Sequence, residues 1–283
     1  MGGGLQRWSV AGRDLELTRP LIMGIINVTP DSFSDGGALS TPAAAVERGL
    51  QMMADGADLI DIGGESTRPG ADPVAVAAEL DRVMPVIEPL VNAGVLVSLD
   101  TSKAEVAAAG LAAGVAVIND VTAGADPEMA SVVAAGEAGF IAMHMLGDPR
   151  TMQDDPRYQD VVVEVGRFLS QRARQLQAAG VPREAICLDP GIGFGKTGEH
   201  NLTLLRRLPE LVALGYPVMI GTSRKSFLGR LTGHDRAEDR DFATAVSVAM
   251  AVARGASVVR VHNVPLCREA VKVAMAIVRP SGA

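Results

Sequence analysis

Side chains that could bind a ligand stand directly after short apolar runs of this 283-residue chain. Asn27 follows the first such run, and Asp100, Asn119 and Asp189 end three later ones. The two oxygens of a carboxylate can accept two parallel N–H bonds from an amidine-like edge, such as that of a 2-amino-4-oxo-pyrimidine. Asp100, Asn119 and Asp189 therefore form an acceptor-rich set that suits a flat nitrogen heterocycle.

Basic side chains follow other apolar runs and suit a different chemical group. Arg68 and Lys225 lie in polar segments just after such runs, and Arg260 and His262 close the last run. Arginine and lysine are the residues that most often bind phosphate oxygens. The two sets together predict a pocket for a flat heterocycle that carries an anionic tail.

Short apolar runs alternate along the chain with segments whose apolar residues recur at helical spacing. The expected strands are 21–27, 58–63, 95–100, 115–119, 139–145, 185–189, 217–222 and 257–262. The expected helices are 42–56, 73–94, one that begins with the capping-box spacing of Ser102 and Glu105, one that begins at 126–127, and 156–179, 200–214, 238–254 and 265–278.

Strands and helices that alternate in this number predict an α/β fold, a parallel sheet closed into a (β/α)8 TIM barrel. The active site of such a barrel lies at the carboxyl ends of its strands, which is where the polar residues named above stand. A doubly wound open sheet is the alternative, but no GxGxxG fingerprint follows the first buried strand.

The segment 5–18 alternates apolar and polar residues on both sides of Ala11-Gly12-Arg13, which predicts an N-terminal β-hairpin. Because the hairpin precedes the first buried strand, we expect it to cover the barrel end opposite the active loops. We expect residues 1–283 to form one domain, with 280–283 as a tail.

Composition and charge argue against several classes of partner. The formal net charge is -7 and no basic run exceeds two residues, so we expect no nucleic-acid partner. The start lacks a signal-peptide core, and no apolar stretch reaches the roughly 20 residues of a membrane span. Cys187 and Cys267 lie far apart, which favours a reducing compartment over a disulfide framework. A cytoplasmic protein without a membrane partner is expected.

Eight motifs carry a family resemblance: GIINVTPDSFSDGG, DIGGESTRPG, SLDTSK, INDV, MHMLGDPRTMQ, LDPGIGFGK, GTSRKSFLG and VRVHNV. In this order, over 21–280, they resemble the dihydropteroate synthases, a pterin-binding TIM-barrel family. The resemblance implies a transferase of folate biosynthesis that is inhibited by sulfonamides. Its implied reaction condenses 7,8-dihydropterin-6-ylmethyl diphosphate with 4-aminobenzoate to give 7,8-dihydropteroate and diphosphate. The resemblance also implies Mg2+ as the cofactor and, commonly, a homodimer. Asn263 stands where many members have Asp, and we expect this change to affect activity little.

The same resemblance implies roles for the matching residues. The implied pterin ligands are Asp100, Asn119, Met143, Asp189 and Lys225. The implied diphosphate ligands are Asn27, which would also reach Mg2+, Thr67, Arg68, Arg260 and His262. The implied 4-aminobenzoate ligands are Phe33, Thr67, Pro69, Phe194, Lys225 and Ser226, under loops 29–37 and 66–70 that would close over this substrate. The implied catalytic group is Lys225, Asp100, Asp189, Arg260 and His262.

Other functions remain open at this point. A pterin-binding methyltransferase domain with a corrinoid partner would share the Asp and Asn ring contacts but would not need Arg260 and His262. A Schiff-base aldolase would use Lys225, which borohydride trapping would reveal. A non-catalytic paralogue would bind a pterin for another purpose.

Some polar residues near the strand ends have simpler explanations. Asp61 is either a structural carboxylate that caps neighbouring loop amides or a substrate ligand. His144 is expected to be a core or rim histidine, and Arg224, unlike Lys225, a solvated helix start.

Overall fold

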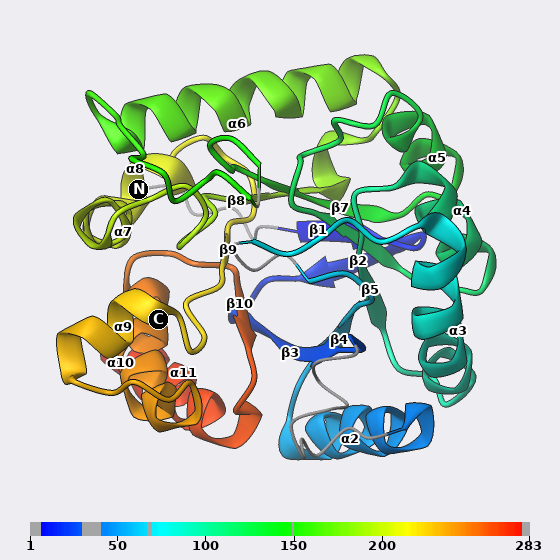
Figure 1. Cartoon of the computed structure of the whole chain (residues 1–283), viewed down its shortest axis with the longest axis horizontal. Helices are drawn as coiled ribbons and strands as arrows, with labels where there is room; N and C mark the ends of the chain where they lie inside the picture. Colours follow the sequence, from blue (N-terminus) through cyan, green and yellow to red (C-terminus); the bar gives the residue numbers. More distant parts are fainter. Residues whose placement is uncertain (1–6, 30–40, 67–69, 149, 279–283) are drawn as a thin grey trace.

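A closed ring of parallel strands forms the centre of the protein, whose computed structural model describes residues 7–29, 41–66, 70–148 and 150–278. The strands are β3 (Leu21–Asn27), β4 (Leu59–Gly63), β5 (Val97–Asp100), β6 (Val117–Asp120), β7 (Gly139–Met143), β8 (Ile186–Asp189), β9 (Met219–Ile220) and β10 (Val258–Val261). They pair in the order β8-β7-β6-β5-β4-β3-β10-β9. A parallel bridge between Leu188 and Val218 joins the two ends of this order, so the ring closes (Figure 1). The expected (β/α)8 barrel is confirmed, and the open sheet is excluded.

Alternate side chains of the strands fill the inside of the barrel. One buried apolar cluster includes Leu59, Val117, Ile141, Cys187 and Val258. Two residues further along the same strands stand Asp61, Asn119, Met143, Asp189 and Arg260. Because side chains at i and i+2 share one face of a strand, the second set also points inward, one layer nearer the carboxyl ends. The sequence thus stacks a largely polar layer on an apolar one.

Helices surround the ring and bury their apolar faces against its outer side (Figure 1). They are α2 (Pro42–Asp55), α3 (Val76–Asn92), α4 (Ala104–Ala112), α5 (Met129–Ala135), α6 (Val161–Ala178), α7 (Gly198–Arg206), α8 (Leu208–Val212), α9 (Ser226–Thr232), α10 (Asp241–Ala253) and α11 (Val264–Val278), with the 3-10 turns η1 (Arg183–Ala185) and η2 (Glu238–Arg240). Helix α2 shows the local logic. Thr41 caps the Ala44 amide, Pro42 occupies the first turn, and Gly56 ends the helix in the left-handed conformation at φ 105°.

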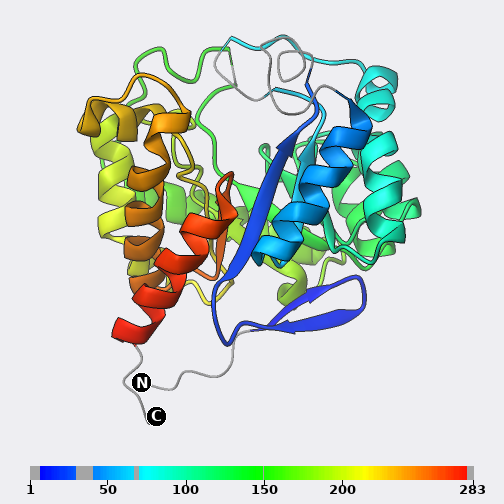
Figure 2. The same cartoon turned by 90° about the horizontal axis from the view of Figure 1, so that it is seen from below.

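The N-terminal hairpin closes the amino end of the barrel (Figure 2). Strand β1 (Arg7–Val10) pairs antiparallel with β2 (Arg13–Glu16). Trp8 is completely buried, and its indole Nε1 donates to the Ala185 carbonyl at 2.9 Å. Val10 lies so close to Gly139, the first residue of β7, that a Cβ there would come within 2.5 Å of it. The hairpin is therefore a plug at the end opposite the polar layer, as expected.

Two strand and helix boundaries differ from the sequence expectation because of backbone geometry. Strand β9 is only two residues long, since the chain leaves the ring at 221–225 through a turn in which Arg224 has a φ of 59°. The helix expected at 200–214 is divided between α7 and α8. Pro209, in the first turn of α8, lacks the amide hydrogen needed to continue α7. The short helix α9 lies outside the expected helix ranges, although a helix start was considered at Arg224.

Two helix starts also differ. Helix α6 begins at Val161 rather than near 156, because the Asp160 side chain caps the amides of Val162 and Val163. The capping box expected at 102–105 does not form. Helix α4 begins after Lys103 without a side-chain cap from its own start, and the Ala104 amide donates to Asp126 at 3.0 Å instead.

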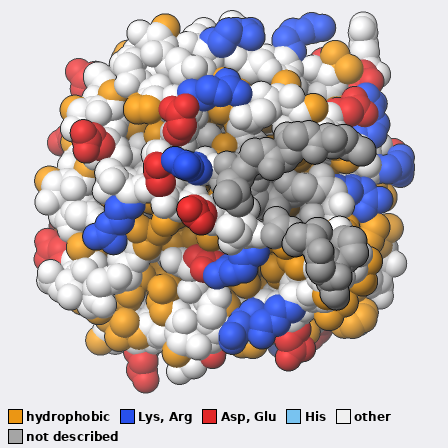
Figure 3. Space-filling model, turned by 180° about the vertical axis from the view of Figure 1, so that it is seen from behind, with side chains coloured by type: hydrophobic (Ala, Val, Ile, Leu, Met, Phe, Trp, Pro, Cys, Tyr) orange, Lys and Arg blue, Asp and Glu red, His pale blue; other side chains and the backbone are white. Residues whose placement is uncertain are grey.

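Acidic and basic side chains are interspersed on the face seen from behind (Figure 3), rather than separated into areas of one sign. Among the described residues, no helix combines the length and the apolar character that crossing a bilayer requires.

Candidate active site

Arg260 lies at the centre of the polar layer, between two carboxylates from neighbouring strands. Its Nε donates to Asp61 at 2.5 Å, and its Nη2 donates to Asp100 at 2.9 Å. The Asn119 amide donates to the same Asp61 oxygen at 3.1 Å. Asp61 is completely buried, so it acts on Arg260 and Asn119 rather than on loop amides. Strands β4, β5, β6 and β10 thereby bring four predicted or considered site residues together.

Burial dominates the electrostatics of two carboxyls in this layer. Removal from water raises the pKa of Asp100 to about 7, with Arg260 opposing the shift and Asp61 adding to it. Burial likewise raises the pKa of Asp189 to about 6, opposed by the Gly191 amide and the nearby lysines. A ligand that donates hydrogen bonds to these two carboxylates would therefore stabilise their ionised forms.

Asp189 is part of a second group, which comes from the β8–α7 connection and the residues after β9. Its Oδ1 accepts from the Gly191 amide at 2.7 Å. Met143 pairs with Asp189 in the register of β7 and β8 and is buried. The Lys225 ammonium lies 4.0 Å from the centre of the Phe194 ring, a cation–π contact. An aromatic face, an ammonium and a carboxylate thus converge on one side of the mouth.

A buried lysine supports the Phe194 loop from below. Lys196 is 2% exposed, and its ammonium lies 2.9 Å from His144 Nδ1 and donates to the Phe194 carbonyl at 2.9 Å. Burial, aided by Lys196, lowers the pKa of His144 to about 3, so this imidazole is neutral and accepts from the ammonium. His144 also packs edge-on against Phe168. The expectation of a core histidine is confirmed.

His262 is held by the residue that precedes Arg224 in the turn after β9. The Ser223 hydroxyl accepts from the His262 backbone amide at 3.0 Å and lies 2.8 Å from its Nδ1. Burial, with Arg224 and Arg260, lowers the pKa of His262 to about 3. The ring is therefore neutral at pH 7, so it would bind an anion through a ring N–H as a hydrogen-bond donor and not as a cation.

A cavity of about 360 Å³ opens beside this centre. Asp100, Thr101 and Thr122 line it from the strand ends, and Glu65 and Ser66 line it from the loop after β4. Behind Glu65, the Lys103 ammonium bonds both Glu65 and the buried Glu79. This contact fixes the described start of that loop at the rim of the cavity.

The described residues leave some expectations out of reach. Phe33, Thr67, Arg68 and Pro69 lie outside them, as do most of the expected loops 29–37 and 66–70, residues 5 and 6 of the expected hairpin and the tail 280–283. Ser226 is the first residue of α9 and is exposed. Asn27 ends β3 beside Gly63 of β4.

The sequence left the role of Asp61 open between a structural carboxylate and a substrate ligand, and it gave Ser223 no role. Asp61 carries a signal that was available, because it stands two residues after the inward-facing Leu59 and must share its face. The role of Ser223 could not be predicted, since its contact with His262 joins positions 39 residues apart through a turn that no spacing rule predicts.

The sequence of this chain is similar to those of known pterin-binding enzymes. The model of the pterin binding enzyme family matches residues 23–262. A dihydropteroate synthase from Neisseria meningitidis serogroup C is 47% identical over 269 residues, which cover 94% of this chain and 95% of that protein. This chain belongs to the dihydropteroate synthase family.

Solved dihydropteroate synthases share the fold. The Xanthomonas albilineans enzyme with 4-aminobenzoic acid superposes with a TM-score of 0.90 at 47% identity, covering 97% of this chain and 98% of that one. A structure of the same bacterium's enzyme in complex with 7,8-dihydropteroate superposes with a TM-score of 0.85 at 41% identity, covering 96% of this chain and 98% of that one.

The residues present fit the Mg2+ that the family resemblance implies. Mg2+ is usually held by one or two protein oxygens together with substrate phosphates and water. A Cβ on Gly63 would lie 3.8 Å from the Asn27 amide oxygen, so this oxygen stands at the carboxyl end of β3 with no Gly63 side chain against it. The described part of the chain contains no group of three or more His, Cys, Asp or Glu able to hold a metal ion alone. This donor set suits an ion that arrives with a phosphate.

Proposed function

We propose that the mouth of this dihydropteroate synthase carries out the family reaction by holding the dihydropterin ring in its carboxylate layer and the diphosphate at its basic rim. Residues 1–283 would act as one pterin-binding domain. The observation that carries the proposal is the Asp61–Arg260–Asp100 cluster, with Asn119 bonded to it, at the carboxyl ends of four strands.

The pterin ring would lie between Asp100, Asn119 and Asp189, with Met143 against its face. The 2-amino group and the ring N–H donate, and the two aspartates accept best when ionised. The pKa values of Asp100 and Asp189 are raised because burial removes water from their carboxylates. The N–H donors of the ring would replace part of that lost hydration. Lys225, beside Asp189, would bind the ring carbonyl.

The diphosphate would be bound by Asn27, Arg260 and the Nε2–H of His262, with Thr67 and Arg68 as further expected ligands. Mg2+ held by Asn27 and the phosphates supplies charge neutralisation of the leaving group. A neutral His262 supplies a directed hydrogen bond without adding a second cation beside Arg260.

The chain's residues would favour breakage of the methylene C–O bond, with the electron pair leaving on diphosphate. The positive charge left on the dihydropterin lies over a layer that includes Asp61, Asp100 and Asp189, which stabilises it electrostatically. The aniline nitrogen of 4-aminobenzoate then forms the new C–N bond and gives up a proton. This nitrogen is nucleophilic as it stands, so no strong base is required.

The 4-aminobenzoate ring would contact Phe194, with Lys225 and Ser226 near its carboxylate. The cation–π contact between Lys225 and Phe194 places a positive charge and an apolar face side by side, which suits an aromatic acid. Phe33, Thr67 and Pro69 are further expected contacts. The Xanthomonas albilineans relative, solved with 4-aminobenzoic acid, supports this substrate class.

A homodimer is proposed through the outer faces of α10 and α11, which pack against each other. Phe242, Val246 and Met250 are exposed at four-residue spacing on α10, as are Val273 and Ile277 on α11. Exposed apolar stripes of this kind are typical of protein interfaces. A cytoplasmic location is proposed because both cysteines are free and buried.

Turnover tests the proposal directly. The purified chain should convert 7,8-dihydropterin-6-ylmethyl diphosphate and 4-aminobenzoate, with Mg2+, into equal amounts of dihydropteroate and diphosphate, and a sulfonamide should suppress both. Asp189→Ala should remove turnover while the far-ultraviolet circular dichroism stays unchanged. A folded wild-type chain that binds the pterin but makes no dihydropteroate would instead identify the non-catalytic paralogue.

A further inference from the structure

The turn between β9 and α9 contains a strained residue flanked by two proposed site residues. Arg224 has a φ of 59°, in the left-handed region that residues with a side chain rarely adopt. Ser223 on one side bonds His262, and Lys225 on the other contacts Phe194. Such a conformation persists only where surrounding contacts enforce it.

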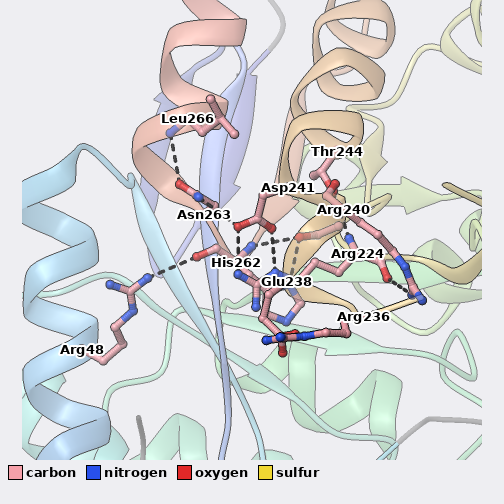
Figure 4. A network of polar contacts seen from close by, with 11 residues as sticks. Arg48, Arg224, Arg236, Glu238, Arg240, Asp241, Thr244, His262, Asn263 and Leu266 are labelled. Atoms are coloured by element: carbon pink, nitrogen blue, oxygen red, sulfur yellow. Dashed lines mark hydrogen bonds and ion pairs between the residues drawn. The ribbon is translucent and has the colours of Figure 1, made fainter. Parts of the chain in front are cut away.

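The enforcing contacts come from helix α10 and the turn before it (Figure 4). Arg224 makes a bidentate ion pair with Asp241, through Nε at 2.7 Å and Nη2 at 3.0 Å. The Arg224 amide donates to Thr244 Oγ1 at 3.0 Å, and its carbonyl accepts from Arg240 at 3.0 Å. The side chain, the N–H and the C=O of one residue are thus all held by η2 and α10.

The same carboxylate also holds the loop after β10 (Figure 4). The Asn263 side-chain amide donates to Asp241 Oδ2 at 2.9 Å, and its oxygen accepts from the Leu266 amide at 3.2 Å at the start of α11. Asn263 directly follows His262 in the chain. Asp241 therefore ties together the two loops that meet at the Ser223–His262 hydrogen bond.

The carboxylate stays ionised over the pH range in which an enzyme is assayed. Burial raises the pKa of Asp241, but hydrogen bonds from Arg224 and Asn263 outweigh burial and leave the pKa below its usual value. The ion pair is partly shielded, with side chains 26% and 17% exposed. A bidentate pair in this setting fixes geometry better than an open surface pair does.

We propose that Arg224, Asp241 and Asn263 are positioning residues, which hold Ser223, His262 and Lys225 in place from behind the active site without touching substrate. The expected loss of kcat/KM rests on the proposed function. The expected change in how His262 is held does not. It gives the Arg224 side chain, expected to be solvated, a defined task. It also gives a role to Asn263, whose side chain was expected to matter little.

Two variants test the unit by different routes. Arg224→Ala and the nearly isosteric Asp241→Asn should each lower kcat/KM for the pterin diphosphate about 10- to 100-fold, because displacements near 1 Å cost this much. The double variant should be scarcely worse than either single one, since partners in one contact are not additive. Arg224→Lys, which can bond one carboxylate oxygen, should recover part of the loss.

Asn263→Ser separates helix capping from the contact with Asp241. Serine keeps a good cap for α11 but is too short to reach the carboxylate. We expect a loss in kcat/KM of about 3-fold, from one hydrogen bond of ordinary strength. Arg236→Ala is the matched control, because Arg236 lies in the segment between α9 and α10 and pairs only loosely with Glu238 and Asp239 at 76% exposure. It should behave like the wild type.

A nitrogen-15 spectrum of His262 in the ligand-free chain provides a readout that general destabilisation would not move. In the proposed arrangement Ser223 Oγ accepts from the His262 amide and donates its hydroxyl hydrogen to Nδ1, so the wild type should show Nδ1 unprotonated and Nε2 protonated. Arg224→Ala and Asp241→Asn should show mixed tautomers, and Arg236→Ala should not.

Unchanged His262 signals together with wild-type kcat/KM in both variants would overturn the positioning role. If the wild type makes no dihydropteroate, the proposed function fails, while the His262 spectra still decide whether the unit holds this imidazole. A variant that only loses thermal stability, with a wild-type spectrum and wild-type kcat/KM below its melting temperature, would reduce the unit to a structural contact and contradict the inference.

Discussion

At the scale of single residues, the site depends on one guanidinium shared by the fully buried Asp61 and by Asp100, whose side chain is 12% exposed. In the ligand-free protein the Arg260 guanidinium pairs with both Asp61 and Asp100, and it is also the proposed diphosphate ligand. Removal of one partner from such a cluster leaves a buried charge without compensation, which costs far more than the cluster contributes when intact. Stability and binding are therefore coupled at this residue.

Arg260→Gln should lower the free energy of unfolding by about 3–5 kcal/mol, measured by urea denaturation, because Asp61 then stays buried without its cation. Adding Asp61→Asn should restore much of that loss but none of the turnover. Arg206→Gln, which breaks an exposed pair with Glu199, is the control and should cost less than about 1 kcal/mol. Equal effects of Arg260→Gln and Arg206→Gln would contradict the buried cluster.

The pH dependence of pterin binding follows from the raised pKa values of Asp189 and Asp100, about 6 and about 7. In the proposed site, ring N–H groups would bind the ionised carboxylates, so affinity for a free hydroxymethyl-dihydropterin should rise from pH 5 to pH 8. A pterin without diphosphate avoids titration of the phosphate. Calorimetry at several pH values measures this rise, and an affinity that is flat or falls over the range would argue against these acceptors.

The raised pKa values of Asp100 and Asp189 make the folding stability fall with rising pH, whereas pterin affinity should rise. The folded state holds these protons more tightly than the unfolded state, whose aspartates titrate near 3.9. Their contribution to stability is therefore complete below about pH 4 and is lost as the pH rises through about 6 and about 7. Asp189→Asn removes one titration, so its unfolding free energy should decline less over this interval than that of the wild type.

At the scale of elements, alternation along the strands explains what the sequence could predict. Asn119 and Asp189 stand two residues after buried apolar positions, so a barrel places both in its mouth once the strands are recognised. The division of 200–214 at Pro209 follows from proline chemistry and was within reach. The left-handed turn at Arg224 was not, because its conformation is imposed by Asp241 and Thr244 from a separate helix.

The N-terminal hairpin provides a stability test that is independent of catalysis. Trp8→Ala should lower the unfolding free energy by about 3–5 kcal/mol, since it empties a fully buried site and frees the Ala185 carbonyl. The plug lies at the end opposite the active layer, so kcat/KM at 20 °C should stay within about twofold of the wild type. Loss of activity in a variant that remains folded would show that the two ends of the barrel are coupled.

At the scale of the whole molecule, the proposed homodimer would form through the apolar stripes on α10 and α11. Phe242→Asp combined with Ile277→Asp should convert a dimer to a monomer in sedimentation-velocity experiments, because each position is about three-quarters exposed in the single chain and would carry charge into the interface. Val163→Asp, an exposed apolar position on α6, is the control and should leave the dimer intact. A wild-type monomer, or a dimer that survives the double change, would contradict the interface.

In the proposed site, one barrel mouth divides its substrate between a carboxylate half and an anion-binding half. Calorimetry of free hydroxymethyl-dihydropterin and of its diphosphate, with Mg2+, on Asp189→Asn and His262→Ala tests that division most directly. Asp189→Asn should weaken both ligands by a similar factor, whereas His262→Ala should weaken the diphosphate alone. If His262→Ala weakens both ligands equally, or if Asp189→Asn leaves the free pterin bound as before, the two halves do not exist as described.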